Sequence, residues 1–317
     1  MLRRLIALLV AVSAPGVALA DQNDLVLGRL TSRMDDGAGN TIIIPQNAEL
    51  RSLASELGVV LAPHMMTPAD TLGFGGFQFT VDYTTTTIDS DAAHWRARQG
   101  SETPSSLSTV GFFARKGMWF PIPGFEVGGG ATHLVDSNIW TAQFYTKVGF
   151  VEGYHQLPIP SVAARGAVSR MMSQRELDLT VASFDVVASK HFGIGGTWRL
   201  DPFVGWNLLM IIPRSEVIDP TPDVDPLEPG NQDDSMNSFV FKDQDVILRN
   251  RFSVGVKMQF SVVQLTIEAT FALAGKSKDD RSGTNVACVP DSTTTACDAT
   301  DSAGAQRTLS ASAGIDF

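Results

Sequence analysis

Nucleophilic catalysis is the first chemistry that the residue types of this sequence could support. It requires a serine, threonine or cysteine nucleophile with a base within hydrogen-bond reach. Among the histidines we single out His133, which lies near Ser137 and Asp136 at the end of a predicted strand. Spacing alone does not make a catalytic triad, because a triad is defined by its geometry, and turns rich in serine and aspartate are common. We therefore expect no enzymatic activity.

Metal binding and disulfide formation are the next candidates. The stretch 213–239 is acidic and rich in proline. It lacks the glycine-centred spacing of a calcium loop, so we expect a solvated loop there. Cys288 and Cys297 are expected to form a local disulfide if the chain is exported to an oxidising compartment. Because no histidine lies near them, they do not complete a zinc site, and we expect no metal and no cofactor.

Charged side chains also recur on the polar faces of segments in which apolar and polar residues alternate. Six acids and six bases make up this set: Asp82, Glu126, Lys147, Arg165, Asp185, Arg199, Asp201, Arg249, Arg251, Lys257, Glu268 and Asp316. A balanced set facing one interior favours internal ion pairs over ion selectivity, which needs rings of one sign. The alternative is a narrow substrate path lined by four of the bases: Arg165, Arg249, Arg251 and Lys257.

The segment 307–317 shows most clearly which kind of secondary-structure element carries these side chains. Its apolar residues all fall on one side: Leu309, Ala311, Ala313, Ile315 and Phe317. Polar residues and glycine alternate with them, and a period of two predicts a β-strand with one apolar and one polar face. Its length is about the 9–11 residues that a tilted strand needs to cross a bilayer.

Nine further segments show the same alternation, one of them (107–115) more weakly, so that the sequence predicts ten strands, with twelve as the alternative. They span residues 76–84, 107–115, 125–134, 140–150, 161–170, 177–192, 198–211, 248–260 and 263–273. The first half of 177–192 is ambiguous and suggests a bulge. Together the ten segments predict an all-β fold, an antiparallel up-and-down transmembrane barrel over residues 73–317. Its bore would be only slightly wider than that of an eight-stranded barrel, which side chains nearly fill.

The connections between these segments give the expected barrel an orientation. Membrane barrels have short periplasmic turns and long outer loops. The three long connections, 85–105, 213–239 and 275–306, all fall on the same side. Aromatic residues gather toward the two strand ends, as in the girdles of membrane barrels. They are Tyr83, Trp140, Phe150, Phe192, Trp198, Trp206, Phe260, Phe271 and Phe317.

Two segments precede the strands. Residues 1–20 have a basic start, an apolar run and the small-residue site Ala18-Leu19-Ala20, which predicts a secretory signal peptide. Residues 21–72 contain one amphipathic helix at 47–62, where apolar residues recur at helical spacing and Pro63 is a stop. We expect this helix to cap the open end of the barrel. The alternatives are a plug in the lumen, a position on the periplasmic rim, or packing on a partner.

Charge and hydropathy exclude other classes of protein. The formal net charge of −10 argues against nucleic acid as a partner. The chain is 44% hydrophobic but its mean hydropathy is only +0.06, as expected when apolar and polar residues alternate. After the signal peptide there is no apolar run of about 18 residues, so we expect no transmembrane helix.

Three short runs and the final residue carry a resemblance to a known class. The runs are 160–170, 177–180 and 189–193, and the chain ends on the aromatic Phe317. With these features, residues 73–317 resemble outer-membrane β-barrel proteins of Gram-negative bacteria, including uncharacterised ones. The resemblance implies export to the outer membrane, contact with outer-membrane lipid and lipopolysaccharide, and recognition of the C-terminal strand by the barrel-assembly machinery. It leaves the oligomeric state open.

The sequence therefore favours a non-enzymatic outer-membrane barrel with a narrow, charge-balanced lumen. Such a protein would be structural or would interact through its outer loops. The alternative is a porin-like transporter or channel for a small or hydrophobic solute, with the N-terminal helix as its plug.

Overall fold

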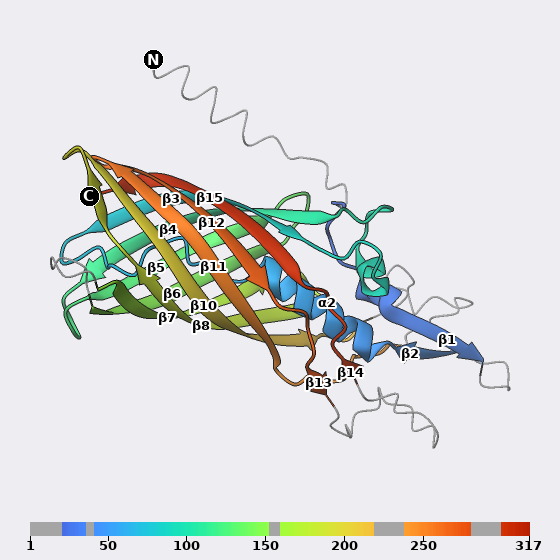
Figure 1. Ribbon diagram of the computed structural model, residues 1–317. Coiled ribbons are helices and arrows are strands. Elements are labelled where there is room, and N and C mark those ends of the chain that lie inside the picture. Colours follow the sequence, from blue (N-terminus) through green and yellow to red (C-terminus); the bar gives the residue numbers. More distant parts are fainter. Residues whose placement is uncertain (1–20, 36–40, 152–158, 219–237, 280–298) are drawn as a thin grey trace, which may run out of the picture.

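The computed structural model describes residues 21–35, 41–151, 159–218, 238–279 and 299–317 (Figure 1). Ten antiparallel strands follow one another around a barrel, and the last pairs with the first, with Ser312 opposite Asp82. The predicted ten-stranded barrel is confirmed. Its strands are β3 (Phe77–Thr87), β4 (Ser106–Met118), β5 (Phe125–Leu134), β6 (Trp140–Val151), β7 (Ser161–Met172), β8 (Leu177–Ser189), β10 (Trp198–Ser215), β11 (Ile247–Phe260), β12 (Val263–Ala272) and β15 (Gln306–Asp316).

The alternation of residue types places polar side chains inside the barrel and apolar side chains outside, the reverse of the arrangement in a soluble protein. In β15, Thr308 is buried at 4% exposure, whereas the next residue, Leu309, is 61% exposed. The same contrast recurs around the barrel, where Gln264 is buried and its neighbour Leu265 is exposed. Successive strand residues point to opposite faces, so polar side chains fill the lumen and apolar ones cover the outside.

Two strand boundaries differ from the sequence prediction. The segment 177–192 is not one strand, because β8 ends at Ser189 and the short β9 (Phe192–Ile194) pairs instead with the start of β10. The irregular register lies at Gly149 and Val151 of β6 rather than in β8. Strand β10 also runs four residues further than expected, to Ser215. Beyond its last pair with β11 at Ile211, β10 pairs only with β8, so one of its edges is free. A proline such as Pro213 is tolerated in an edge of this kind.

The barrel has two different ends. We call one the turn end, because short connections such as 119–124 and 261–262 lie there together with Phe317. We call the other the loop end, because it carries the long connections 88–105, 216–246 and 273–305. In Figure 1 the turn end is at the left, beside the label of the C-terminus, and the loop end is at the right.

Residues 21–35 and 41–60 fold over the loop end and form what we call the cap (Figure 1). The cap contains η1 (Leu27–Leu30), β1 (Thr31–Asp35), β2 (Thr41–Pro45) and α2 (Asn47–Val60). The barrel loops add η2 (Ala93–Ala97), β13 (Lys278–Asp279) and β14 (Ala299–Thr300) beside it. Strands β1 and β2 pair with each other as an antiparallel hairpin, which the sequence analysis did not predict.

Helix α2 is buried on nearly all sides, which goes beyond the amphipathic helix that the sequence predicts. Its leucines, Leu50, Leu53 and Leu57, join an apolar core with inward-facing barrel residues such as Leu209. Gly58 allows the closest approach, since a Cβ there would lie 2.6–2.8 Å from side-chain carbons of Ile211. The mouth of the barrel at the loop end is therefore lined by apolar residues, and α2 occupies it.

Candidate functional site: the lumen segment

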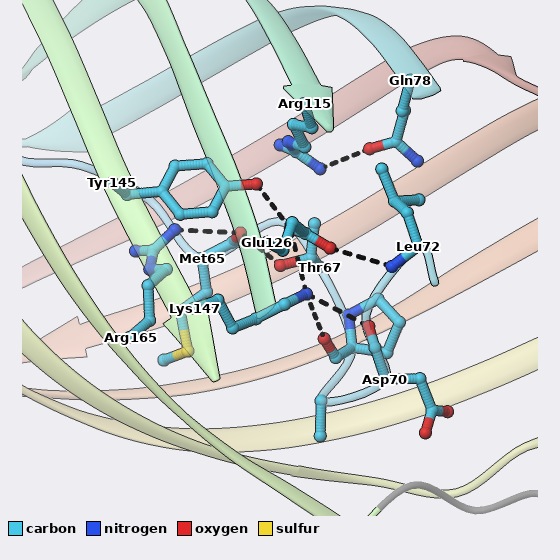
Figure 2. Close-up of polar contacts among 12 residues, drawn as sticks. Met65, Thr67, Asp70, Leu72, Gln78, Arg115, Glu126, Tyr145, Lys147 and Arg165 are labelled. Atoms are coloured by element: carbon cyan, nitrogen blue, oxygen red, sulfur yellow. Dashed lines mark hydrogen bonds and ion pairs between the residues drawn. The ribbon is translucent and has the colours of Figure 1, made fainter. Parts of the chain in front are cut away.

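The chain that leaves α2 enters the barrel and runs through it. We call residues 61–72 the lumen segment. It forms no helix or strand, so its backbone N–H and C=O groups need partners other than a neighbouring strand. The inward-facing side chains of the barrel wall provide them, as Figure 2 shows for part of the path.

Wall donors bind the backbone carbonyls of the lumen segment along its length. The donors are side chains of β6, β7 and β11. The contacts are Ser169 Oγ to Leu61 O (2.9 Å), Arg251 Nη2 to Pro63 O (2.7 Å), Arg165 Nη1 to His64 O (2.7 Å), and Lys147 Nζ to Pro68 O (3.3 Å) and Asp70 O (3.1 Å). The basic wall residues therefore bind backbone carbonyls of the lumen segment in addition to pairing with acidic wall residues.

Wall acceptors bind the backbone N–H groups of the same segment. Two of them are carboxylates, whose charge makes these hydrogen bonds stronger than those between neutral groups. The contacts are Met66 N to Glu268 Oε2 (2.7 Å), Ala69 N to Ser189 Oγ (3.0 Å) and Leu72 N to Glu126 Oε2 (3.1 Å). The segment is thus held from six strands of the wall, β5, β6, β7, β8, β11 and β12.

The densest part of this network surrounds Glu126 (Figure 2). Lys147 Nζ lies 3.2 Å from Glu126 Oε1, and the hydroxyl of Tyr145 donates to the same oxygen at 2.6 Å. The other oxygen, Oε2, accepts from the backbone of Leu72. Glu126 and Lys147 are each only 1% exposed. One buried carboxylate thus ties two wall strands to the end of the lumen segment.

A second group lies deeper in the lumen. Arg165 Nε is 2.5 Å from Asp185 Oδ2, and the amide of Asn207 donates to the other oxygen of Asp185. The side-chain carbonyl of Asn207 accepts from Arg251 Nε at 2.8 Å. Because Arg165 and Arg251 also bind the carbonyls of the lumen segment, this network joins β7, β8, β10 and β11 to it.

The twelve charged residues named from the sequence lie on the inner wall. Ten of them are buried, and Arg199 and Asp316 are half-buried at the turn end. There Lys257 pairs with Asp316 at 2.9 Å, and Arg199 binds Asp201 at 2.7 Å. At the loop end Arg249 donates to Ser55 of α2 at 2.6 Å.

Sequence reasoning missed two parts of this site. Arg115 is buried and donates to Gln78 at 2.7 Å (Figure 2). It ends a segment whose alternation is interrupted by the adjacent Phe112 and Phe113. The lumen segment itself was also missed, because its contacts use backbone atoms that every residue type has.

Little space remains beside the lumen segment. The cavity next to His64 and Arg165 measures about 30 Å³. A water needs roughly 10–15 Å³ of such space, so this cavity holds about two waters. A wider hollow of about 240 Å³ lies at the turn end, between Thr67–Leu72 and the wall residues Lys257 and Asp316. Among the described residues, the lumen segment thus fills the middle of the barrel, and the wider hollow lies at the turn end.

The candidate catalytic group does not assemble. His133 Nε2 lies 2.8 Å from the backbone carbonyl of Ser137, not from its hydroxyl. That hydroxyl donates instead to the carbonyl of Leu134, also at 2.8 Å. A nucleophile must bond to its base, so the turn is held by these contacts and is not arranged as a triad.

The other residues named from the sequence lie on the outside or beyond the described part. Trp206 is half-buried, and the other eight aromatic residues are exposed. Cys288, Cys297, residues 1–20 with the predicted signal peptide, and residues 219–237 of the acidic stretch fall outside the described residues. Within the described residues, no group of three potential metal ligands occurs. No helix in that part of the chain has the length and apolar composition to span a membrane.

Glu56 holds the cap to the loops of the barrel. It is fully buried in α2, accepts from the indole N–H of Trp95 at 2.8 Å, and lies 3.6 Å from His94 Nε2. Burial by itself raises the pKa of Glu56, but the contacts with His94 and Trp95 outweigh burial and hold the pKa below its ordinary value. The carboxylate form is therefore favoured in the folded cap.

We expect the cap to loosen in acid. A carboxyl whose pKa is lowered by folding adds stability above its unfolded pKa, about 4.3 for glutamate, and that stability is lost as the pH falls through the folded value. Limited proteolysis should therefore cut the cap faster as the pH drops below about 4. The Glu56→Gln variant should lose this pH dependence, whereas Glu49→Gln, at a partly exposed position, should keep it. Equal pH dependence in wild type and Glu56→Gln would exclude Glu56 as the cause.

The strand pairing and the polar interior define this chain as a closed β-barrel of the outer-membrane type. It matches no protein-family model and no curated protein sequence. Solved structures of bacterial surface proteins align with it at low similarity. The outer membrane protease OmpT from Escherichia coli is 9% identical, with a TM-score of 0.32, and the alignment covers 78% of this chain and 99% of that one.

Two further solved structures align to a similar extent. Neisserial surface protein A is 13% identical, with a TM-score of 0.27 and coverage of 77% and 98%. Ail, the attachment invasion locus protein of Yersinia pestis, is 11% identical, with a TM-score of 0.27 and coverage of 77% and 99%. These values carry no argument about residues or activity, so the barrel assignment rests on the strand pairing.

Proposed function

We propose that this protein is a non-enzymatic barrel of the bacterial outer membrane whose lumen is permanently closed and which acts through the face at its loop end. The observation that carries the proposal is the lumen segment. The segment covers charged wall residues, and its backbone provides the hydrogen-bond partners that these residues need once water is excluded. Glu268 and Arg251, for example, both bind backbone atoms of the segment, and a buried charge without a partner is costly. The wall is therefore matched to a filled lumen.

The outer-membrane location is supported by the apolar outside of the barrel. Exposed residues such as Phe79, Phe144, Val204 and Leu265 point away from the polar lumen. Soluble monomers rarely expose apolar patches larger than a few hundred Å², whereas lipid-facing barrel strands require them. The aromatic residues near the strand ends fit the two interfacial girdles, with Trp198 against Phe260 at the turn end.

The alternative of a solute transporter receives less support. A transport path requires either a bore or a plug that leaves easily. Here α2 is packed into an apolar core at the loop end, and the lumen segment is bonded to six strands below it. A role in binding at the loop end needs neither a bore nor a moving plug.

Membrane location and fold are tested together. After expression in a Gram-negative host, the protein should be found in the outer-membrane fraction of a density gradient. Unboiled protein should migrate differently from boiled protein on a denaturing gel, because a folded barrel resists the detergent. Recovery in the soluble periplasm, or identical migration of both samples, would contradict the proposal.

A further inference from the structure

The chain enters the barrel from the loop end. The cap makes its contacts with the barrel loops at that end. The amide of Asn23 donates to the carbonyl of Val135 at 2.7 Å, and Leu27 N donates to Glu176 at 2.6 Å. Further contacts join Lys242 N to Asn47, Arg51 to Ser277 and Ser55 to Asp301. The described residues of the cap are thereby fixed at the loop end.

The partners of the lumen segment then follow one another toward the turn end. Ser169, which binds Leu61, lies near the loop end of β7. Arg165, which binds His64, lies four residues further toward the turn end of the same strand. The later partners, Ser189 and Glu126, lie at or next to the turn-end residues of β8 and β5. The order of partners shows that the segment crosses the barrel in one direction.

The lumen segment is long enough for a complete crossing. Residues 61–72 reach roughly 40 Å if fully extended, at about 3.3–3.6 Å per residue. The hydrocarbon core of a bilayer is about 30 Å thick. The segment ends just before β3, whose first residue, Phe77, pairs with Phe317 at the turn end. The chain therefore passes from one end of the barrel to the other before its first strand begins.

The lengths of the connections assign a side of the membrane to each end. Membrane barrels place short turns in the periplasm and long loops outside. Here 88–105, 216–246 and 273–305 lie at the loop end, and 119–124 and 261–262 lie at the turn end. The loop end therefore faces the cell exterior if the protein is an outer-membrane barrel.

We propose that residues 21–60 lie on the cell surface and that the chain crosses the outer membrane eleven times, once through its own lumen. This inference rests on the proposed function, because it needs the outer membrane. It makes the cap, rather than the barrel loops alone, the face that a partner outside the cell meets. The β1–β2 hairpin projects furthest from the barrel in Figure 1 and belongs to that face.

Thiol labelling of whole cells tests the inference. Cys288 and Cys297 are first replaced by serine, so that only an introduced thiol reacts. Three exposed positions then receive cysteine: Ser32→Cys in the cap, Ser101→Cys in the loop 88–105, and Ile122→Cys at the turn end. A membrane-impermeant maleimide–biotin is added to intact cells and, in parallel, to cells with permeabilised outer membranes. We expect Ser32→Cys and Ser101→Cys to label in intact cells, and Ile122→Cys to label only after permeabilisation.

Each other outcome overturns a definite part of the account. Labelling of Ser101→Cys but not of Ser32→Cys in intact cells would refute the crossing through the lumen and leave the proposed function standing. Labelling of Ile122→Cys alone in intact cells would show that the barrel is inverted and that the cap faces the periplasm. If no variant were labelled before permeabilisation, both the proposed function and the inference would be contradicted.

Discussion

A variant without residues 21–72 is expected to form an ion-conducting pore in a planar bilayer. All ten barrel strands, from β3 to β15, remain in this variant. Its polar inner wall would take up water once the lumen segment is gone, because charged groups such as Glu268 and Arg251 lose their backbone partners. Single-channel recording should therefore show a stable open level.

The matched control removes the cap hairpin but keeps the residues that close the lumen. A variant without residues 21–46 retains α2 and the whole lumen segment, so we expect it to show no open level. Each variant must first show the heat-modifiable migration of a folded barrel. If the variant without residues 21–72 folded but showed no open level, wall side chains alone would close the lumen.

The second large effect is expected at Glu126. Replacing it by alanine leaves Lys147 buried at 1% exposure without its carboxylate and also removes the acceptor for Tyr145 and Leu72. Breaking a buried ion pair from one side costs about 3–5 kcal/mol. We expect a loss of that size in the free energy of unfolding, measured by denaturant titration of the protein in detergent micelles or lipid vesicles.

Removal of the partner charge should recover much of this loss. In the double variant Glu126→Ala/Lys147→Met no charge is left unpaired, and replacing both partners of a buried pair by apolar groups is often close to neutral. The ion pair between Arg170 and Asp178 provides the control, because it lies on the outside of the barrel and its two side chains are 66% and 32% exposed. The Arg170→Ala variant should lose at most about 1 kcal/mol in the free energy of unfolding. If the single and double variants were equally destabilised, packing rather than unpaired charge would explain the effect.

Most of the barrel could be predicted from the sequence because the alternation that marks its strands is visible within each short segment. A strand with one lipid-facing and one lumen-facing side must alternate, and β15 does so in nearly every residue. The same rule placed the charged residues on the inner face before any contact was known. Helix α2 was also predictable, since its leucines and Pro63 mark it within the sequence, although its end lies at Val60 rather than at residue 62.

The contents of the lumen could not be predicted in this way. The lumen segment is held through its carbonyls and amides, so its side chains carry little signal. Residues 21–46 fold against partners such as Val135 and Glu176, more than a hundred positions away. Where the sequence did suggest chemistry, at His133 and Ser137, the spacing could not show that the hydroxyl bonds to the carbonyl of Leu134.

The balance of six acids and six bases takes on a different meaning once the segment is in place. From the sequence it suggested that the wall closes itself by ion pairs, and pairs such as Arg165–Asp185 do form. Several of the same residues also bind the backbone of the lumen segment, and Arg165 does both. Charge balance is then what allows one peptide, with its alternating donors and acceptors, to be bound inside a buried wall.

The most direct test of the closed lumen is single-channel recording of the intact, folded protein in a planar bilayer. The account predicts no stable open level, because the lumen segment blocks the bore and leaves room beside His64 for only about two waters. A stable open level of the intact chain, in a preparation shown to be folded, would contradict it.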